Sequence, residues 1–242
     1  EHPDLFWALR GSGGQNFGVV VEHTYKLPPK LNEGSLINFD FMHCEKETMK
    51  QIVMTYQALF QHLDRRMNMK LGMYNSMQKG YGIRITGLFY GTRNEAIQIL
   101  EPILKFVTPQ TIWSIDEMSI LEANRDIQDS HPDYENYKSS GRFVYQAFTE
   151  PDLDMFFEII KERAVGAYYT AISLYGLGGA VAEKSKEETA FYYRDALFIL
   201  GFQSVWDNNE VANRNIEWFL PRFEQLKSIT KGTFVNFPSL QL

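Results

Sequence analysis

Two glycine clusters are the part of this sequence with the clearest potential for chemistry. The first is Gly11-Ser12-Gly13-Gly14-Gln15-Asn16-Phe17-Gly18, and the second is Gly176-Leu177-Gly178-Gly179, which follows an apolar run. Glycines in such a setting allow another backbone, or a flat ring or pyrophosphate, to come close to main-chain N–H groups. A tight turn between packed elements explains the first cluster equally well. The clusters therefore predict close approach to the backbone, by a ligand or by a neighbouring element.

The first cluster does not fit the dinucleotide-binding fingerprint. That fingerprint requires a strand, then the glycines, then a helix. Here a helical segment, 4–10, precedes the glycines and a β-branched segment, 19–27, follows them. The sixth position of the motif is also occupied by Asn16 rather than glycine. Order and residue type together exclude a Rossmann site.

The other common catalytic and metal-binding patterns are absent from the sequence. The five histidines are scattered, Cys44 is the single cysteine, and there is no His-Glu-x-x-His motif. A nucleophile elbow and a phosphate-binding loop are also missing. His43 beside Cys44 is more typical of a structural pair than of metal ligands. The sequence predicts no metal site and no internal disulfide.

Composition limits the class of protein and of partner. The chain has 242 residues, of which 44% are hydrophobic and 14% aromatic, enough for a full core and suited to sheets. A net charge of −6 without a basic cluster argues against a nucleic-acid partner. No apolar run is long enough to cross a bilayer, so we expect a soluble protein without a membrane partner. Cys44 fits a reducing compartment, which favours the cytoplasm without excluding secretion.

Periodicity and turn residues predict an α+β fold. Segment 28–34, with its paired prolines, is the clearest linker. Beyond it, a strand, a helix, two strands, a helix and a strand follow in the ferredoxin-like order β-α-β-β-α-β. The expected ranges are 35–42, 45–63, 69–77, 83–90, 92–106 and 110–115. Thr92 and Glu95 have the spacing of a capping box. We expect an antiparallel sheet with helices on one face.

The second half of the sequence repeats this layout more loosely. We expect a helix over 118–127, a polar surface loop over 129–141, and then alternating strands and helices. The remaining strands are predicted over 143–148, 168–175 and 190–206, and the remaining helices over 151–163 and 208–226. The second glycine cluster then belongs to a pair of strands, 174–181 and 189–203, joined by a charged tip.

Three motifs in order resemble the berberine-bridge-enzyme-like, FAD-linked oxidases of the VAO/PCMH type. Segment 4–20, Asp-Leu-Phe-Trp-Ala-Leu-Arg-Gly-Ser-Gly-Gly-Gln-Asn-Phe-Gly-Val-Val, is similar to the end of their FAD-binding domain. Tyr175-Gly176-x-Gly178-Gly179, followed by Thr189-Ala190-Phe191-x-x-Arg194, resembles paired strands of their substrate domain. Phe234-Val235-Asn236-Phe237-Pro238 resembles the point where their chain returns to the flavin. The resemblance spans nearly the whole chain.

This resemblance implies a division of the chain and a set of flavin contacts. Residues 1–30 would be the tail end of an FAD-binding domain, 31–230 the substrate-binding α+β domain, and 231–242 the start of the return to the FAD-binding domain. The parent protein would oxidise an alcohol or sugar-like small molecule by hydride transfer to FAD, with O2 as acceptor. The residues implied to lie against FAD are Gly13, Gly14, Asn16, Phe17, Gly18, Val19 and Asn236.

The same resemblance implies candidates for the proton-transfer and substrate residues. Some members use an acidic residue a few positions beyond the paired glycines, where Glu183 stands here, to take a hydroxyl proton. The alternative is that Glu183 simply begins the solvated charged tip 183–188. Other members use a tyrosine where this chain has Phe237, which has no proton to exchange. Tyr193 replaces the usual histidine before the arginine. Tyr175, Tyr193 and Gln203 are the candidates for substrate binding.

The sequence is compatible with two interpretations of the chain. The main nucleotide-binding domain of the family is missing from the sequence, so we expect this piece alone neither to hold FAD tightly nor to turn over substrate. The alternative is a freestanding ferredoxin-like module for binding or dimerisation, without catalysis. Segment 1–27 favours the first interpretation, because a freestanding module has no need for a segment shaped to the cofactor of another domain.

Overall fold

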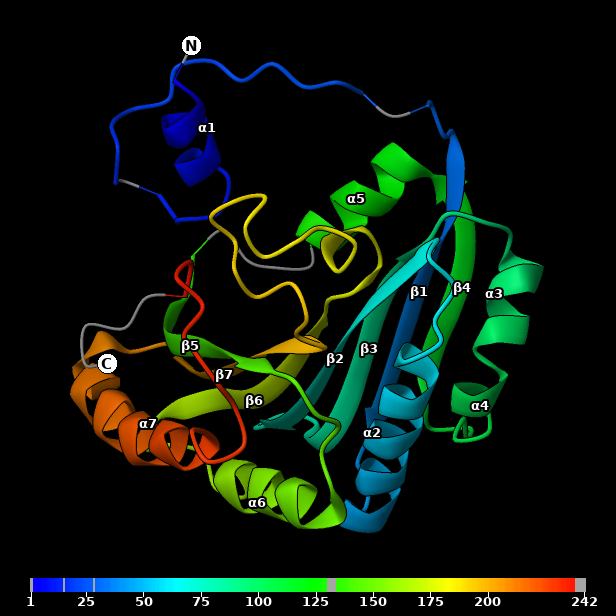
Figure 1. The fold of residues 1–242 in the computed structure, drawn as a ribbon. Coiled ribbons are helices and arrows are strands. Elements are labelled where there is room, and N and C mark those ends of the chain that lie inside the picture. The colour runs from blue at the N-terminus through cyan, green and yellow to red at the C-terminus, as the bar shows by residue number, and fades with distance from the viewer. Residues whose placement is uncertain (1, 15, 28, 130–133, 238–242) are drawn as a thin grey trace.

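One seven-stranded antiparallel sheet organises the molecule (Figure 1). The computed structural model describes residues 2–14, 16–27, 29–129 and 134–237. The strand order is β4-β1-β3-β2-β6-β7-β5. The strands are β1 (Glu33–Met42), β2 (Met67–Ser76), β3 (Gly80–Phe89), β4 (Ile112–Ser119), β5 (Asn136–Val144), β6 (Ala167–Gly176) and β7 (Phe198–Trp206). The α-helices are α1 (Pro3–Leu9), α2 (Lys46–Phe60), α3 (Arg93–Ile99), α4 (Glu101–Leu104), α5 (Ile120–Asp129), α6 (Glu150–Ile160) and α7 (Ala212–Leu226).

The predicted fold class is confirmed by this topology. The first four strands have the ferredoxin-like spatial order β4-β1-β3-β2, and β6 extends the sheet by pairing with β2. Two short 3-10 helices, η1 (Gly179–Val181) and η2 (Asn209–Val211), complete the elements. Within the described part of the chain, no helix is long and apolar enough to cross a membrane.

The core lies between the sheet and the helices on one of its faces. In β2, alternate residues Met69, Leu71 and Met73 are at most 3% exposed and belong to the core shared with α2, α6 and α7. The hydroxyl of Tyr56 on α2 donates to the carbonyl of Met69 at 2.9 Å, so even the polar atom of this buried ring is satisfied. Because side chains alternate along a strand, the intervening residues face the other side of the sheet. Figure 1 shows α2, α6 and α7 together on the covered side.

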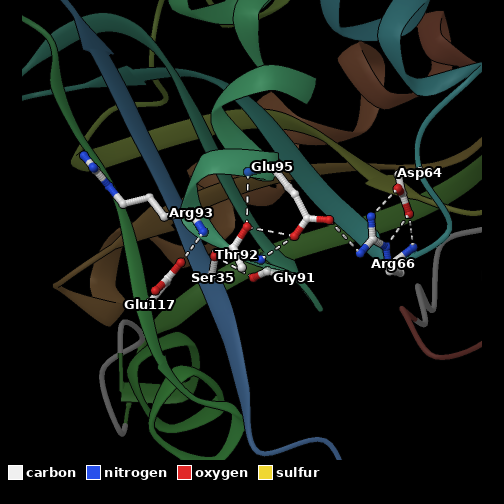
Figure 2. A network of polar contacts seen from close by, with 8 residues as sticks. All are labelled: Ser35, Asp64, Arg66, Gly91, Thr92, Arg93, Glu95 and Glu117. Carbon is white, nitrogen blue, oxygen red and sulfur yellow. Dashed lines mark hydrogen bonds and ion pairs between the residues drawn. The ribbon is translucent and has the colours of Figure 1, made fainter.

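The predicted capping box at the start of α3 is confirmed. The side chain of Thr92 accepts from the backbone N–H of Glu95, and Glu95 accepts from the N–H of Thr92 at 2.9 Å. Glu95 also accepts from Arg66 at 3.0 Å, and Arg66 in turn donates to Asp64 at 2.9 Å. Figure 2 shows this chain of contacts, which joins α3 to the segment that enters β2. A second contact, from the N–H of Arg93 to Glu117 at 2.5 Å, joins α3 to β4.

The predicted single helix over 92–106 is wrong in its middle. The segment forms α3 and α4, which meet at Leu100. Pro102 lies in the first turn of α4, where its missing N–H needs no partner, whereas one continuous helix would need that N–H.

The predicted strand over 19–27 is also wrong. Its described residues are irregular, and Val19 and Val21 are 91% and 93% exposed. β-branched residues favour strands only where a neighbouring strand takes their backbone hydrogen bonds. None of the described strands pairs with this segment.

The polar segment predicted as a loop over 129–141 contains an edge strand instead, apart from 130–133, which lie outside the described residues. β5 begins at Asn136 and pairs with β7 along its whole length. An edge strand has one side open to solvent, so polar residues are compatible with it. The strand predicted over 143–148 therefore ends early, at Val144. The N–H of Phe148, beyond the strand, donates to the side-chain oxygen of Gln57 at 2.7 Å.

The pair of strands predicted around the second glycine cluster is shorter than expected. β6 ends at Gly176 and β7 begins only at Phe198, so neither 177–181 nor 189–197 is strand. Gly178 and Gly179 have φ angles of 112° and 48°, which break the strand ladder. The side chain of Arg194 donates to the carbonyls of Phe191 and Val181, and so holds the intervening loop together.

Candidate functional site

A cavity of about 850 Å³ lies on the face of the sheet that α2, α6 and α7 leave uncovered. Its floor is formed by outward-facing residues of β3, β2, β6 and β7, and α5 contributes Asn124 and Ile127 to its wall. This volume is in the range of small-molecule sites. The sheet residues on its floor include Lys70, Gly72, Tyr74, Arg84, Thr86, Tyr169, Ser173, Tyr175 and Gln203.

Two of the predicted substrate residues, Tyr175 and Gln203, line this cavity. Tyr175 lies opposite Lys70 on β2, and the Lys70 ammonium is 4.7 Å from the centre of the Tyr175 ring. Burial raises the pKa of Tyr175 above its ordinary value. The ring of Phe237 lies 5.8 Å from that of Tyr175, so the C-terminal segment contacts a residue of the cavity floor through an apolar ring.

The third predicted substrate residue, Tyr193, belongs to a separate aromatic cluster. Its ring stacks on Phe143 with 3.7 Å between centroids, and Phe191 and Phe234 complete the contacts around Phe143. A Cβ added to Gly232 would lie 2.7 Å from Tyr193, so this glycine allows the close packing. Tyr193 is not among the described residues that line the large cavity. Its place is typical of a structural aromatic residue.

Glu183 lies outside the cavity lining and forms an ion pair with Arg65. Both side chains are more than half exposed. Arg65 itself lines the cavity, so the pair stands at its rim. An exposed pair of this kind contributes little to stability because water screens it. Glu183 therefore lies at the rim of the cavity, with its carboxylate paired to Arg65.

An acidic centre that the sequence reasoning missed lies at one side of the cavity. Asp40, 8% exposed on β1, accepts hydrogen bonds from Tyr74 at 2.6 Å, Lys79 at 2.8 Å and Arg84 at 3.2 Å. Burial alone would raise the pKa of Asp40, but the hydrogen bonds from Lys79 and Tyr74 and the charge of Arg84 bring it below its ordinary value. Burial and then the bond to Asp40 raise the pKa of Tyr74. The centre is therefore an ionised carboxylate with a protonated tyrosine.

Tyr169 and Lys70 complete the polar floor. The ring of Tyr169 lies 5.8 Å from that of Tyr74, and burial, partly offset by Arg84, raises the pKa of Tyr169 to about 12. Burial lowers the pKa of Lys70, and the positive charge of Arg84 lowers it further. The sequence signal for these residues is a polar alternation, Lys70, Gly72, Tyr74 on β2 and Arg84, Thr86 on β3, within otherwise apolar strands.

The two segments that hold the residues implied to contact FAD approach each other at Gly13 and Val235. A Cβ added to Gly13 would lie 2.8 Å from Val235, the residue before Asn236. Gly14 and Gly18 have open space where a Cβ would stand, and Gly18 has a φ of 124°, which favours glycine. The residues of this set other than Gly13 are exposed: Gly14, Asn16, Phe17, Gly18, Val19 and Asn236. These residues form an exposed glycine strip, whose backbone is open to close approach.

The N-terminal segment is attached to the loop after the second glycine cluster. The indole N–H of Trp7 donates to the carbonyl of Glu187 at 2.6 Å, and the N–H of Ala190 donates to the carbonyl of Trp7 at 3.3 Å. The side chain of Arg10 donates to the carbonyl of Glu188 at 3.4 Å. The first and second motifs, far apart in sequence, are thus neighbours in space.

The sheet and its helices match the fold of about half of the berberine bridge enzyme and of Phl p 4. Among solved structures, the chain matches Phl p 4, a grass pollen allergen with glucose dehydrogenase activity, with a TM-score of 0.79 at 16% identity, over 99% of this chain and 50% of that one. It also matches the berberine bridge enzyme-like protein 28 of Arabidopsis thaliana, with a TM-score of 0.73 at 16% identity, over 87% of this chain and 46% of that one.

Sequence comparison finds FAD-linked oxidoreductases among the relatives of this chain. No family model matches the chain. The FAD-linked oxidoreductase YgaK of Bacillus subtilis is 26% identical over 246 residues, which cover all of this chain and 52% of that protein. A carbohydrate oxidase of Microdochium nivale is 24% identical over 98% of this chain and 50% of that protein. The homologues are therefore FAD-linked oxidoreductases and berberine bridge enzyme-like proteins, as the motifs predict. The chain spans about half the length of the curated relatives that it matches.

Proposed function

We propose that this chain is the substrate-binding half of an FAD-linked oxidoreductase that oxidises an alcohol or sugar-like small molecule. The observation that carries the proposal is the position of the cavity. It lies on the uncovered face of the sheet, and Phe237 of the segment expected to return to the flavin contacts Tyr175 on its floor. A cofactor held along the exposed glycine strip and at Asn236 would therefore border the same cavity. In this proposal residues 31–230 bind substrate, while 1–30 and 231–242 belong with the FAD-binding domain of the parent protein.

Each part of the chain has a role in this proposal. Gly13, Gly14, Asn16, Phe17, Gly18, Val19 and Asn236 would hold FAD on its substrate side. When bound, FAD supplies the acceptor for the hydride of the substrate, and O2 is the final acceptor. Tyr175 and Gln203 on the floor would orient the substrate hydroxyl by hydrogen bonding. Relatives described as a carbohydrate oxidase and a chitooligosaccharide oxidase support a sugar-like substrate.

Glu183 is the proposed base, acting after its carboxylate separates from Arg65. The test is Glu183→Gln in the full-length parent protein, with Glu187→Gln on the same charged tip as the control. Loss of a positioned base lowers kcat by about 10²- to 10⁴-fold. We expect that loss for Glu183→Gln and unchanged kcat for Glu187→Gln. Equal, small effects of the two substitutions would assign Glu183 to the solvated tip and remove it from the mechanism.

Flavin binding tests the proposed function as a whole. We expect the full-length parent protein to purify with a flavin absorption spectrum, and this chain alone to stay colourless after addition of FAD and gel filtration. Co-expression of the chain with the FAD-binding half should restore the spectrum. A full-length protein without flavin would overturn the proposal and favour a freestanding binding module. A chain that alone retains FAD would contradict the predicted dependence on the other half.

A further inference from the structure

The geometry points to a substrate that carries an anionic oxygen group, a carboxylate or a phosphate, bound by Lys70 on the floor of the cavity. This inference deepens the proposed function and rests on it, because it assigns the chemical class of the substrate at the same site. It follows from the charges that face the cavity and from a gap between the side chains of its floor.

Most of the cationic side chains at the cavity already have carboxylate partners. Of the described residues, five such side chains line it: Arg65, Arg66, Lys70, Lys79 and Arg84. Arg65 pairs with Glu183, and Lys79 and Arg84 share Asp40. Arg66 is held between Asp64 and Glu95 at 2.9 and 3.0 Å, as Figure 2 shows. Each of these four cations therefore has at least one carboxylate partner within the protein, although Lys79 and Arg84 share theirs.

Lys70 differs from the other four. In the part of the chain that the structure describes, no carboxylate lies within ion-pair distance of its ammonium. Its close contact is the face of the Tyr175 ring, and its pKa is lowered by burial and by Arg84. A positive charge that is partly removed from water and not paired is costly. A bound anion would supply the missing charge.

Among the described residues, two carboxylates line the cavity, and both stand at its other end. Glu135 accepts from the hydroxyl of Tyr168 at 3.1 Å, and Asp207 directly follows β7. Tyr168 and Tyr175 are seven residues apart on β6, which corresponds to about 23 Å of extended chain. Lys70 thus places an unpaired positive charge at one end of the cavity, and Glu135 and Asp207 place negative charges at the other. A substrate with an anionic group would bind in one orientation.

A hollow in the floor beside Lys70 provides the space for that group. Gly72 follows Lys70 on the same face of β2, and its neighbours across the sheet are Arg84 on β3 and Ser173 on β6. A Cβ added to Gly72 would meet only the Ser173 hydroxyl, at 3.4 Å. Thr86, opposite Lys70, adds a second hydroxyl. An anionic oxygen group in the hollow could accept from the ammonium and from both hydroxyls.

The experiment measures binding to the purified chain by isothermal titration calorimetry, so it needs no flavin. The probes are D-glucuronate, glucose 6-phosphate and D-glucose, which share a sugar ring and differ in the charged group. We expect at least one anionic probe to bind roughly ten- to hundredfold more tightly than D-glucose, the range of one charge-assisted hydrogen bond. The two anionic arms distinguish a carboxylate from a phosphate. Equal affinities for all three probes, or no binding of the anionic ones, would overturn the inference.

Three variants assign the effect to Lys70 and the hollow. Lys70→Met should abolish the preference for the anion, and Lys70→Arg should keep it. Gly72→Val should fill the hollow and weaken anion binding, although the ammonium is retained. Lys105→Met, at an exposed position directly after α4, removes one positive charge outside the cavity lining and should leave binding unchanged. Circular dichroism checks that each variant is folded, and a preference that survives both Lys70→Met and Gly72→Val would overturn the inference.

Failure of the anionic-substrate inference can be distinguished from failure of the proposed oxidoreductase function. If the full-length protein lacks flavin but anion binding depends on Lys70, the proposed oxidoreductase function is wrong and the chain is an anion-binding module. If the full-length protein contains flavin but the cavity binds D-glucuronate, glucose 6-phosphate and D-glucose equally, the oxidoreductase function stands and the inference of an anionic substrate is wrong.

Discussion

The two faces of the sheet are built from the same strands and serve opposite purposes. On the covered face, β7 places Phe198, Leu200 and Phe202, all at most 2% exposed, against the helices. On the other face, the same strand places Gly201 and Gln203 toward the cavity side. Alternation along one strand thus separates residues that hold the fold from residues that can be exchanged without unfolding it. The stability of the domain should depend on one face and its ligand chemistry on the other.

The largest expected effect compares neighbouring residues of β7. Phe202 is fully buried and its ring lies 4.6 Å from that of Phe219 on α7. Phe202→Ala should lower the free energy of unfolding by about 3–5 kcal/mol, because it removes buried apolar area and leaves a cavity. Gln203→Ala, one position further, should change it by less than about 0.5 kcal/mol. Urea denaturation measures both, and similar losses would contradict the division of roles between the faces.

A smaller effect is expected at Asp40, where the cavity face has a buried charge centre of its own. Asp40→Asn keeps the shape of the side chain but removes the negative charge that Tyr74, Lys79 and Arg84 contact. We expect a loss of about 1–2 kcal/mol at neutral pH, since Lys79 and Arg84 are partly exposed and water screens their charges.

The pH dependence of stability sharpens the prediction for Asp40. Because the pKa of Asp40 is lower in the folded than in the unfolded protein, its contribution is fully present above the unfolded value near 3.8. The contribution is lost as the pH falls through the lower, folded pKa. The difference in unfolding free energy between wild type and Asp40→Asn should therefore shrink below about pH 4. Asp116→Asn, at an exposed position on β4, is the control for removal of one carboxylate and should change the unfolding free energy by less than about 0.5 kcal/mol. A difference for Asp40→Asn that does not change with pH would contradict an ionised Asp40.

The covered face was predictable from the sequence, whereas the cavity face was predictable only in part. Apolar periodicity located most helices and strands, because burial against a common core imposes it. Alternation alone does not say which face of the sheet Tyr175 points to, whereas its register with Lys70 determines this. Asp40 could not be found from local sequence, because its three partners come from β2, β3 and the turn between them. Segment 19–27 has the strand propensity of β-branched residues but is not a strand, because propensity does not supply a partner strand.

The smallest expected effect is that of Thr92→Ala on ligand affinity, which shows whether the covered face and the cavity face are coupled through Arg66. Arg66 lines the cavity, while its partner Glu95 belongs to the capping box of α3. Thr92→Ala removes the cap and should cost about 1 kcal/mol of unfolding free energy, whereas Thr92→Ser should retain it. Because Arg66 keeps its bond to Asp64, we expect the affinity of the cavity for its ligand to change by less than about twofold. Calorimetric titration beside urea denaturation measures both quantities. A large loss of ligand affinity in Thr92→Ala would mean that the helix layer sets the geometry of the cavity and that the two faces are not independent.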